Sequence, residues 1–178
     1  MRILGVDPGT IITGYSVIDY DRNELTRITS GIIKIPTTKE QAPRLKIIYT
    51  ELDKLIKQYR PDEFALETAF YGKNVQSTLK IGYARGVSML AAINNNLIIK
   101  EYSPREIKKA VVGNGGASKE QVQFMVKKLL YLRNTKMKFD ESDAMAAAIC
   151  HAFKNNSFSK KSKNWKEFIK ENPGRVID

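Results

Sequence analysis

Cysteine and histidine are nearly absent from the 178 residues, which contain one of each, Cys150 and His151. A single cysteine cannot close an internal disulfide, and a single histidine excludes sites that need several. No apolar run approaches the ~20 residues of a membrane-spanning helix, and the opening MRILGVD lacks the pattern of a signal peptide. We therefore expect a soluble, cytoplasmic protein in which any metal site is built mainly from carboxylates.

Acidic residues are scarce relative to basic ones. Nineteen Asp and Glu stand against 30 Lys and Arg, giving a formal net charge of +11 and a pI of about 9.7. This excess favours an anionic partner, most commonly nucleic acid, although charge alone fits a lysine-rich surface without such a partner equally well. The length and the 42% hydrophobic content suit one globular domain with a full core.

Segments with strand-like patterns come first and then alternate with helical ones. Strands are predicted over residues 2–6, 12–20, 24–35, 64–66 and 97–102, and helices over 44–59, 75–94, 104–112, 119–132 and from 140 through 149. Ser103 and Ser118 are the expected N-caps of two of these helices. The order predicts an α/β fold, one mixed sheet with helices on both faces, over residues 1–154. Residues 155–178 are polar and basic, and they predict a tail that is either flexible or a short docking helix.

Four acids stand where they could meet. Asp7 ends the first strand and Glu67 ends a buried one, so parallel neighbouring strands would bring both to one edge of the sheet. Asp140 and Asp143, three residues apart at the start of the last helix, face the same side. An all-oxygen cluster of this kind suits magnesium, with manganese as a substitute. Two such ions ~3.5–4 Å apart would activate water and stabilise the leaving oxygen of a phosphodiester.

Each acid also has an ordinary explanation. Asp7 precedes Pro8-Gly9 and could be a turn former, and Glu67 could be a solvated strand end. Asp140 could be an N-cap, and Asp143 could interact with the helix dipole. The four positions alone therefore leave catalysis and local structure both open.

Basic and aromatic residues near these acids could hold a nucleic acid. A glycine-rich loop, residues 113–116, lies among Arg105, Lys108, Lys109 and Lys119, and such loops bind phosphate, although surface lysines explain the segment as well. Lys108 or Lys119 could also offset charge in a transition state. Exposed aromatics could stack on unpaired bases, with core packing as the alternative. The candidate DNA-contacting residues are Phe70, Tyr71, Lys73, Arg85, Lys108, Lys109 and Lys119.

Four motifs, in order along the chain, resemble those of the bacterial RuvC family of Holliday junction resolvases. They are ILGVDPGT-x-x-TGYSVI, LETAFYGKNVQSTLKIGYARG, YSPREIKKAVVGNGGASKEQV and DESDAMAAAICHA, and the likeness extends from Met1 to about Phe153. The resemblance implies a ribonuclease H-like fold with a five-stranded mixed sheet and helices on both faces. It also implies a homodimer that nicks two opposed strands of a four-way junction, leaving 5′-phosphate and 3′-hydroxyl ends.

The resemblance assigns roles to individual residues. It implies that Asp7, Glu67, Asp140 and Asp143 are the catalytic acids that bind two magnesium ions. Lys108 and Lys119 are the implied phosphate-contacting or catalytic-support lysines, and Phe70 is the implied junction-stacking aromatic. Partnership with the RuvA–RuvB branch-migration complex is a further implied trait. We expect the helix that begins near Val75 to form the dimer surface.

The sequence departs from the family pattern in two places near the acids. Some members carry His at the position of Asp140, and the pair Thr68-Ala69 differs from the acidic or apolar pair often found there. Three other functions stay open: a ribonuclease H-like nuclease for another nucleic-acid structure, a junction-binding module without catalysis, and a sugar-kinase or actin-like ATPase. The last class also begins with a strand and Asp-x-Gly, but it needs a second phosphate loop and usually twice this length.

Overall fold

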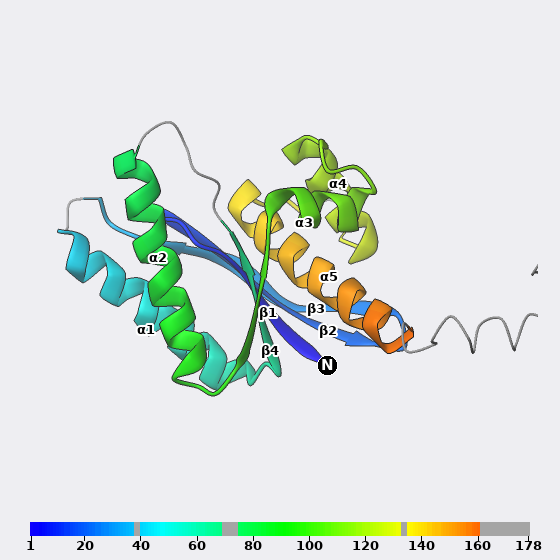
Figure 1. The fold of residues 1–178 in the computed structure, drawn as a ribbon, viewed down its shortest axis with the longest axis horizontal. Helices are drawn as coiled ribbons and strands as arrows, with labels where there is room; N and C mark the ends of the chain where they lie inside the picture. Colours follow the sequence, from blue (N-terminus) through cyan, green and yellow to red (C-terminus); the bar gives the residue numbers. More distant parts are fainter. Residues whose placement is uncertain (38–39, 69–74, 133–134, 161–178) are drawn as a thin grey trace, which may run out of the picture.

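The computed structural model describes residues 1–37, 40–68, 75–132 and 135–160 (Figure 1). Its strands are β1 (Arg2–Asp7), β2 (Ile12–Asp21), β3 (Glu24–Lys34), β4 (Glu63–Glu67) and β5 (Ile98–Tyr102). Its helices are α1 (Gln41–Tyr59), α2 (Val75–Ile93), α3 (Pro104–Val112), α4 (Lys119–Leu129) and α5 (Phe139–Lys160). None of the described helices is long and apolar enough to cross a membrane.

The strands form one mixed sheet in the order β3-β2-β1-β4-β5. β1, β2 and β3 are an antiparallel meander, whereas β4 and β5 run parallel to β1 after the helical crossovers. Helices cover both faces, with α1 and α2 on one side and α3, α4 and α5 on the other (Figure 1). The predicted five-stranded mixed sheet with two helical layers is therefore confirmed.

Alternation along β1 decides which residues face which layer. Leu4 and Val6 pack with α1 and α2, while Ile3 packs with α5 on the opposite face. Because successive strand residues point to opposite faces, Asp7 falls on the α5 side together with Ile3 and Gly5. The end of the first strand is thus turned toward the last helix.

Two glycines allow α5 to lie almost directly on the sheet. A Cβ atom on Gly5 of β1 would lie 2.2 Å from the carbonyl oxygen of Ala144, and one on Gly14 of β2 would lie 1.9 Å from that of Asp140. Neither distance leaves room for a side chain, so both positions require glycine for this packing. Ala144 and Ala148 of α5 lie against Gly5 at this close approach.

The far end of α5 is held by a buried polar network around His151. Its Nδ1 lies 2.8 Å from the Tyr102 hydroxyl of β5, and its Nε2 lies 2.8 Å from Oε2 of Glu63 in β4. Asn155 also contacts Glu63 through its side-chain amide. His151 and Cys150 are fully buried.

Element ends differ from the predictions by a few residues. α1 begins at Gln41 rather than near Arg44, and α4 ends at Leu129 instead of 132. α5 continues to Lys160, beyond the predicted domain end at 154. Ser103 and Ser118 cap α3 and α4 as expected, and each forms a reciprocal capping box.

Candidate active site

Asp7 and Glu67 end neighbouring parallel strands at the same edge of the sheet. In the β1–β4 register Val6 is opposite Leu66, so the next residue on each strand is one of these acids. Ala65 packs on the α5 side, and the two-residue period places Glu67 on that side too. The sheet therefore brings the two carboxylates to the same edge, as the sequence predicted.

The first turn of α5 brings Asp140 and Asp143 to the same edge. α5 begins at Phe139, so Asp140 is inside the first turn and not its N-cap. The carbonyl of Asp140 rests above Gly14, which is the partner of Asp7 in the β1–β2 register. The close packing of α5 on β2 is therefore what sets the two helical carboxylates beside Asp7.

The proton affinities of the strand acids show how strongly the carboxylates interact. Removal from water, together with the charges of Asp143 and Asp140, raises the pKa of Asp7 from 3.8 to about 7. Burial and the charges of Asp7 and Asp143 raise the pKa of Glu67 from 4.5 to about 8. These carboxylates share one electrostatic environment, in which burial and mutual repulsion disfavour their simultaneous ionisation.

Lys119, the first residue of α4, supplies positive charge to this environment. Its Nζ donates to Oδ2 of Asp143 at 2.8 Å and lies 5.9 Å from the ring centre of Phe139. Its charge lowers the pKa of both Asp7 and Glu67 against the larger raising effects. The hydrogen bond to Asp143 in turn raises the pKa of Lys119, which therefore stays protonated.

The donor set suits a divalent cation that prefers oxygen ligands. Across the described ranges, no three acidic, His or Cys side chains already stand in an arrangement that would enclose an ion. Asp143 is turned toward Lys119, to which it is ion-paired. Burial and neighbouring acids raise the pKa values of Asp7 and Glu67, and a divalent ion would favour the ionised form of both carboxylates. The four carboxylates therefore fit such an ion.

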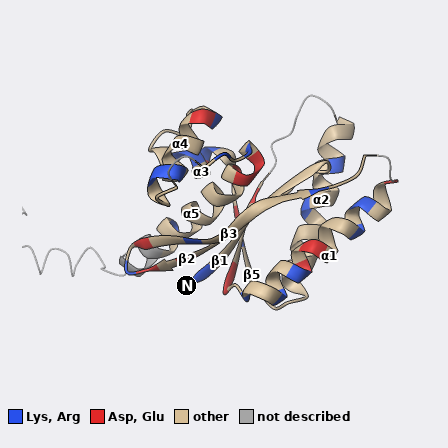
Figure 2. Cartoon of the chain, turned by 180° about the vertical axis from the view of Figure 1, so that it is seen from behind, with Lys and Arg blue, Asp and Glu red and all other residues tan. Residues whose placement is uncertain are grey.

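The other residues predicted to contact DNA differ in how near they lie to the acids. Lys108 in α3 is near enough to Glu67 to lower the pKa of that carboxyl, and Lys109 is exposed on the same helix. Arg85 in α2 forms an ion pair with Glu101 of β5, which offsets its charge. Basic segments are visible on α3 and α4 and along α1 and α2 (Figure 2). Phe70, Tyr71 and Lys73 lie outside the described residues.

Sequence reasoning missed a contact that positions the first turn of α5. Ser30 of β3 donates from its hydroxyl to Oε1 of Glu141 at 2.7 Å. This bond ties the start of α5 to the edge of the meander and fixes its rotation beside Asp140. The two residues are 111 positions apart, and only the DESD run around Glu141 could have drawn attention to one of them.

Comparison with known protein families shows which family this chain belongs to. The family model described as "Crossover junction endodeoxyribonuclease RuvC" matches residues 3–151. The chain belongs to the RuvC family. A family member from Chloroherpeton thalassium is 46% identical over 99% of this chain and all of its own length. One from Alkaliphilus oremlandii is 47% identical over 88% of this chain and 95% of its own.

Two solved structures of Holliday junction resolvases have the same fold. Thermus thermophilus RuvC in complex with its Holliday junction substrate superimposes with a TM-score of 0.84 at 26% identity, covering 89% of this chain and 97% of that one. The yeast mitochondrial Holliday junction resolvase Ydc2 gives a TM-score of 0.70 at 14% identity, covering 94% of this chain and 84% of that one. The second likeness shows the fold alone, and both confirm the predicted ribonuclease H-like architecture.

Proposed function

We propose that this chain is a structure-selective DNA endonuclease that resolves four-way junctions by paired, symmetric nicks. The observation that carries the proposal is the convergence of Asp7, Glu67, Asp140 and Asp143 at one sheet edge in a member of the RuvC family. Hydrolysis would add water at phosphorus and break the bond to the 3′ oxygen, leaving 5′-phosphate and 3′-hydroxyl ends.

The four carboxylates would hold two magnesium ions, with manganese as a substitute. When bound, such ions lower the pKa of water and neutralise charge on the phosphodiester. Asp7 and Glu67 enter from the ends of β1 and β4. Asp140 and Asp143 enter from α5, and one of them would accept a proton from the attacking water. Lys119, which donates a hydrogen bond to Asp143, would orient that carboxylate and offset negative charge that develops on the phosphate.

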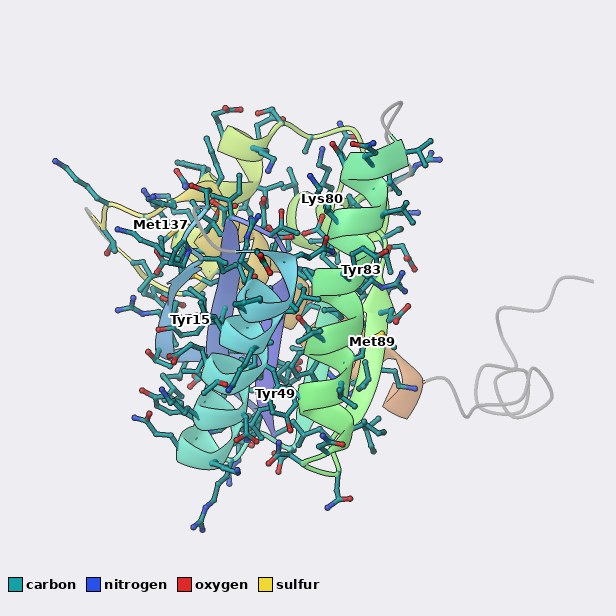
Figure 3. The ribbon with its side chains drawn as sticks, turned by 90° about the vertical axis from the view of Figure 1, so that its left-hand side faces the viewer. Tyr15, Tyr49, Lys80, Tyr83, Met89 and Met137 are labelled. Carbon is teal, nitrogen blue, oxygen red and sulfur yellow. The ribbon has the colours of Figure 1, made fainter. Side chains whose placement is uncertain are left out.

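A second copy of the chain is the proposed partner at α2. Exposed apolar residues line this helix at helical spacing: Val75, Leu79, Tyr83, Leu90 and Ile93. A Cβ atom on Gly82 or Gly86 would meet nothing within 4 Å, so another backbone has room to approach there. Figure 3 shows α2 beside α1 with Lys80 and Tyr83 on successive turns. A two-fold dimer would supply the two active sites that two symmetric nicks require.

The same proposal includes contacts to DNA and a partner complex. The lysines that would contact the DNA backbone are Lys73, Lys108, Lys109 and Lys119, and Phe70 or Tyr71 would stack on bases. The partner would be the RuvA–RuvB branch-migration complex. Arg85 would take part only if its ion pair with Glu101 opens.

A nicking assay tests the proposed function. Synthetic four-way junctions with mobile cores of varied sequence are incubated with and without magnesium, beside a linear duplex and an RNA–DNA hybrid of matching sequence. Symmetric, magnesium-dependent nicks confined to the junction are the expected result. Equal cutting of the duplex or hybrid would assign the same chemistry to a different substrate, and binding without cutting on every core sequence would indicate a junction-binding module.

A further inference from the structure

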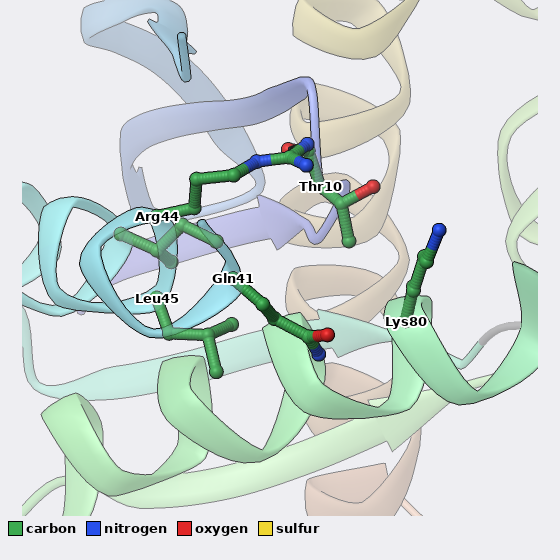
Figure 4. Close-up of a pocket in the computed structure, with 6 residues that line it drawn as sticks. Thr10, Gln41, Arg44, Leu45 and Lys80 are labelled. Atoms are coloured by element: carbon green, nitrogen blue, oxygen red, sulfur yellow. Dashed lines mark hydrogen bonds between the residues drawn. The ribbon is translucent and has the colours of Figure 1, made fainter. Parts of the chain in front are cut away.

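A small cavity lies between the β1–β2 turn, which follows Asp7, and the start of α1 and α2, on the face of the sheet that these helices cover. It has a volume of about 200 Å³ and is lined by Thr10, Gln41, Arg44, Leu45, Ile48 and Lys80 (Figure 4). Thr10 follows Asp7 by three residues, in a turn closed by hydrogen bonds between Gly9 and Thr13. The cavity therefore borders the same turn that leaves the catalytic edge of the sheet.

Two cations reach this cavity without an acidic partner. Neither Arg44 nor Lys80 forms a salt bridge within the described part of the chain. In Figure 4 their charged ends lie on either side of Thr10. Two unneutralised positive charges facing one space favour an anion in it.

Arg44 has a donor that is still unused. One terminal nitrogen of its guanidinium donates to the carbonyl oxygen of Thr10, which holds the group in place. Its Nε is buried and, as far as the described residues go, has no hydrogen-bond partner. A buried donor left unsatisfied costs free energy, and an acceptor that reached Nε would remove that cost.

The size of the cavity limits what the ligand can be. Pockets for drug-sized molecules occupy roughly 300–1,000 Å³, so a nucleoside would not fit in about 200 Å³. A single tetrahedral phosphate fits, and its oxygens match the fork of donors on an arginine.

We propose that Arg44 and Lys80 bind one backbone phosphate of the cleaved strand, close to the phosphodiester that is cut. The inference rests on the proposed function, which supplies the DNA strand, and it adds a specific anchor to it. A phosphate fixed there would set the register of the strand relative to Asp7, because both sites share the β1–β2 turn. The contact reads no base and would act on every sequence alike.

Single methylphosphonate linkages, which lack the phosphate charge, provide the test. They are placed one at a time around the cut site of a synthetic junction, and binding is measured without magnesium for the whole protein. Lys80→Gln removes one cavity charge at an exposed position, so folding is not at risk. Lys54→Gln is the matched control, an exposed lysine further along α1 that pairs with Glu51.

We expect one linkage whose neutralisation weakens binding several-fold in the wild-type protein and in Lys54→Gln but has little effect in Lys80→Gln. Lys80→Gln should also lower the slope of log affinity against log salt by about 0.9. Arg44→Lys keeps the charge and loses the Nε donor. In this variant, neutralising the same linkage should weaken binding less than it does in the wild-type protein.

If sensitivity to every linkage is the same in Lys80→Gln as in wild type, the phosphate site is wrong even when the junction is bound and cut. If Arg44→Lys slows cutting and leaves the linkage pattern unchanged, Arg44 only braces the turn, and the site as proposed is wrong. A wild-type protein that does not bind the junction would overturn the proposed function as well, so the two failures are distinguishable.

Discussion

The carbonyl oxygen of Asp140 occupies the space that a side chain on Gly14 would need, with 1.9 Å between that oxygen and the missing Cβ. Gly14 is also the strand partner of Asp7. One backbone contact therefore joins the two parts of the acid cluster, the strand ends and the last helix. Its removal should affect stability and catalysis together.

Gly14→Ala should displace the first turn of α5 from β2. Overpacking of this kind costs about 1–3 kcal/mol, which corresponds to a fall in melting temperature of roughly 2–4 °C per kcal/mol for a chain of this size. The nicking rate should fall by more than the loss of folded protein explains, because Asp140 and Asp143 move away from Asp7. Calorimetry and the junction assay check this. Gly116→Ala, where a Cβ would have its nearest neighbour at 3.5 Å, is the control. If Gly14→Ala and Gly116→Ala lowered the melting temperature and the nicking rate equally, the contact between Gly14 and Asp140 would not be what positions the acids.

Asp7→Asn and Asp143→Asn should each lower the cleavage rate by roughly 10³-fold, equivalent to about 4 kcal/mol of transition-state stabilisation, while junction binding persists. Each change keeps the shape of the side chain and removes a charged ligand. Single-turnover nicking and gel-shift assays separate the two effects. Asp21→Asn, at the exposed end of β2, should cut normally. Unchanged cutting by Asp7→Asn would show that the catalytic assignment is wrong.

The stability of the metal-free protein should depend on pH. The pKa of Asp7 is raised to about 7 and that of Glu67 to about 8, so the folded state holds more protons than the unfolded state from about pH 4 to 8. Stability is therefore lost as pH rises through this window. Magnesium favours the ionised carboxylates, so it should restore the melting temperature most at the alkaline end. Thermal melts in EDTA and in magnesium at pH 5 and pH 8 measure both effects.

The comparison variant for this pH dependence is Asp7→Asn, which removes one of the two titrating groups. Its melting temperature should fall less between pH 5 and 8 and respond less to magnesium. Identical pH profiles for wild type and variant would show that these carboxylates do not carry the effect.

Lys119→Gln should slow cutting by about 10²-fold, the usual cost of losing one preorganised donor to developing charge. It should also move the pH profile of cutting to more alkaline values, because Lys119 lowers the pKa of Asp7 and Glu67. Lys128→Gln, an exposed lysine of α4 near Phe124, should change neither. A slower enzyme with an unshifted profile would limit Lys119 to phosphate contact.

Leu79→Glu should convert the proposed dimer to monomers, since it places a charge within the apolar stripe of α2. Light scattering measures the mass, and a plasmid with an extruded cruciform measures coupling of the nicks. Coupled nicks give linear DNA, whereas uncoupled ones give nicked circles first. Phe124→Glu alters a comparably exposed apolar residue on α4 and should remain dimeric. A dimeric Leu79→Glu protein would place the interface elsewhere.

The sequence was sufficient for the sheet, the helices and the edge at which Asp7 and Glu67 meet. Strand alternation, capping serines and strand-end acids are local patterns, and each has a direct physical meaning. Contacts between distant segments were not accessible in this way. The packing of Gly14 on Asp140, the bond from Ser30 to Glu141 and the ion pair of Arg85 with Glu101 depend on tertiary geometry.

Arg44 and Lys80 illustrate the same limit. They are ordinary basic residues on two predicted helices, and no spacing rule links them. Only the packing of α1 beside α2 puts both around the turn that follows Asp7. Their proposed role in binding phosphate can therefore be inferred only from the tertiary structure.

The position of α5 at the end of the domain has a consequence for synthesis. Asp7 and Glu67 leave the ribosome before Asp140 and Asp143, which emerge only with the helix that covers one face of the sheet. A partly made chain thus carries half of the acids on an uncovered sheet. The last helix completes the hydrophobic core and the acid cluster in the same event, so a nascent chain would have no nuclease activity until its core can close.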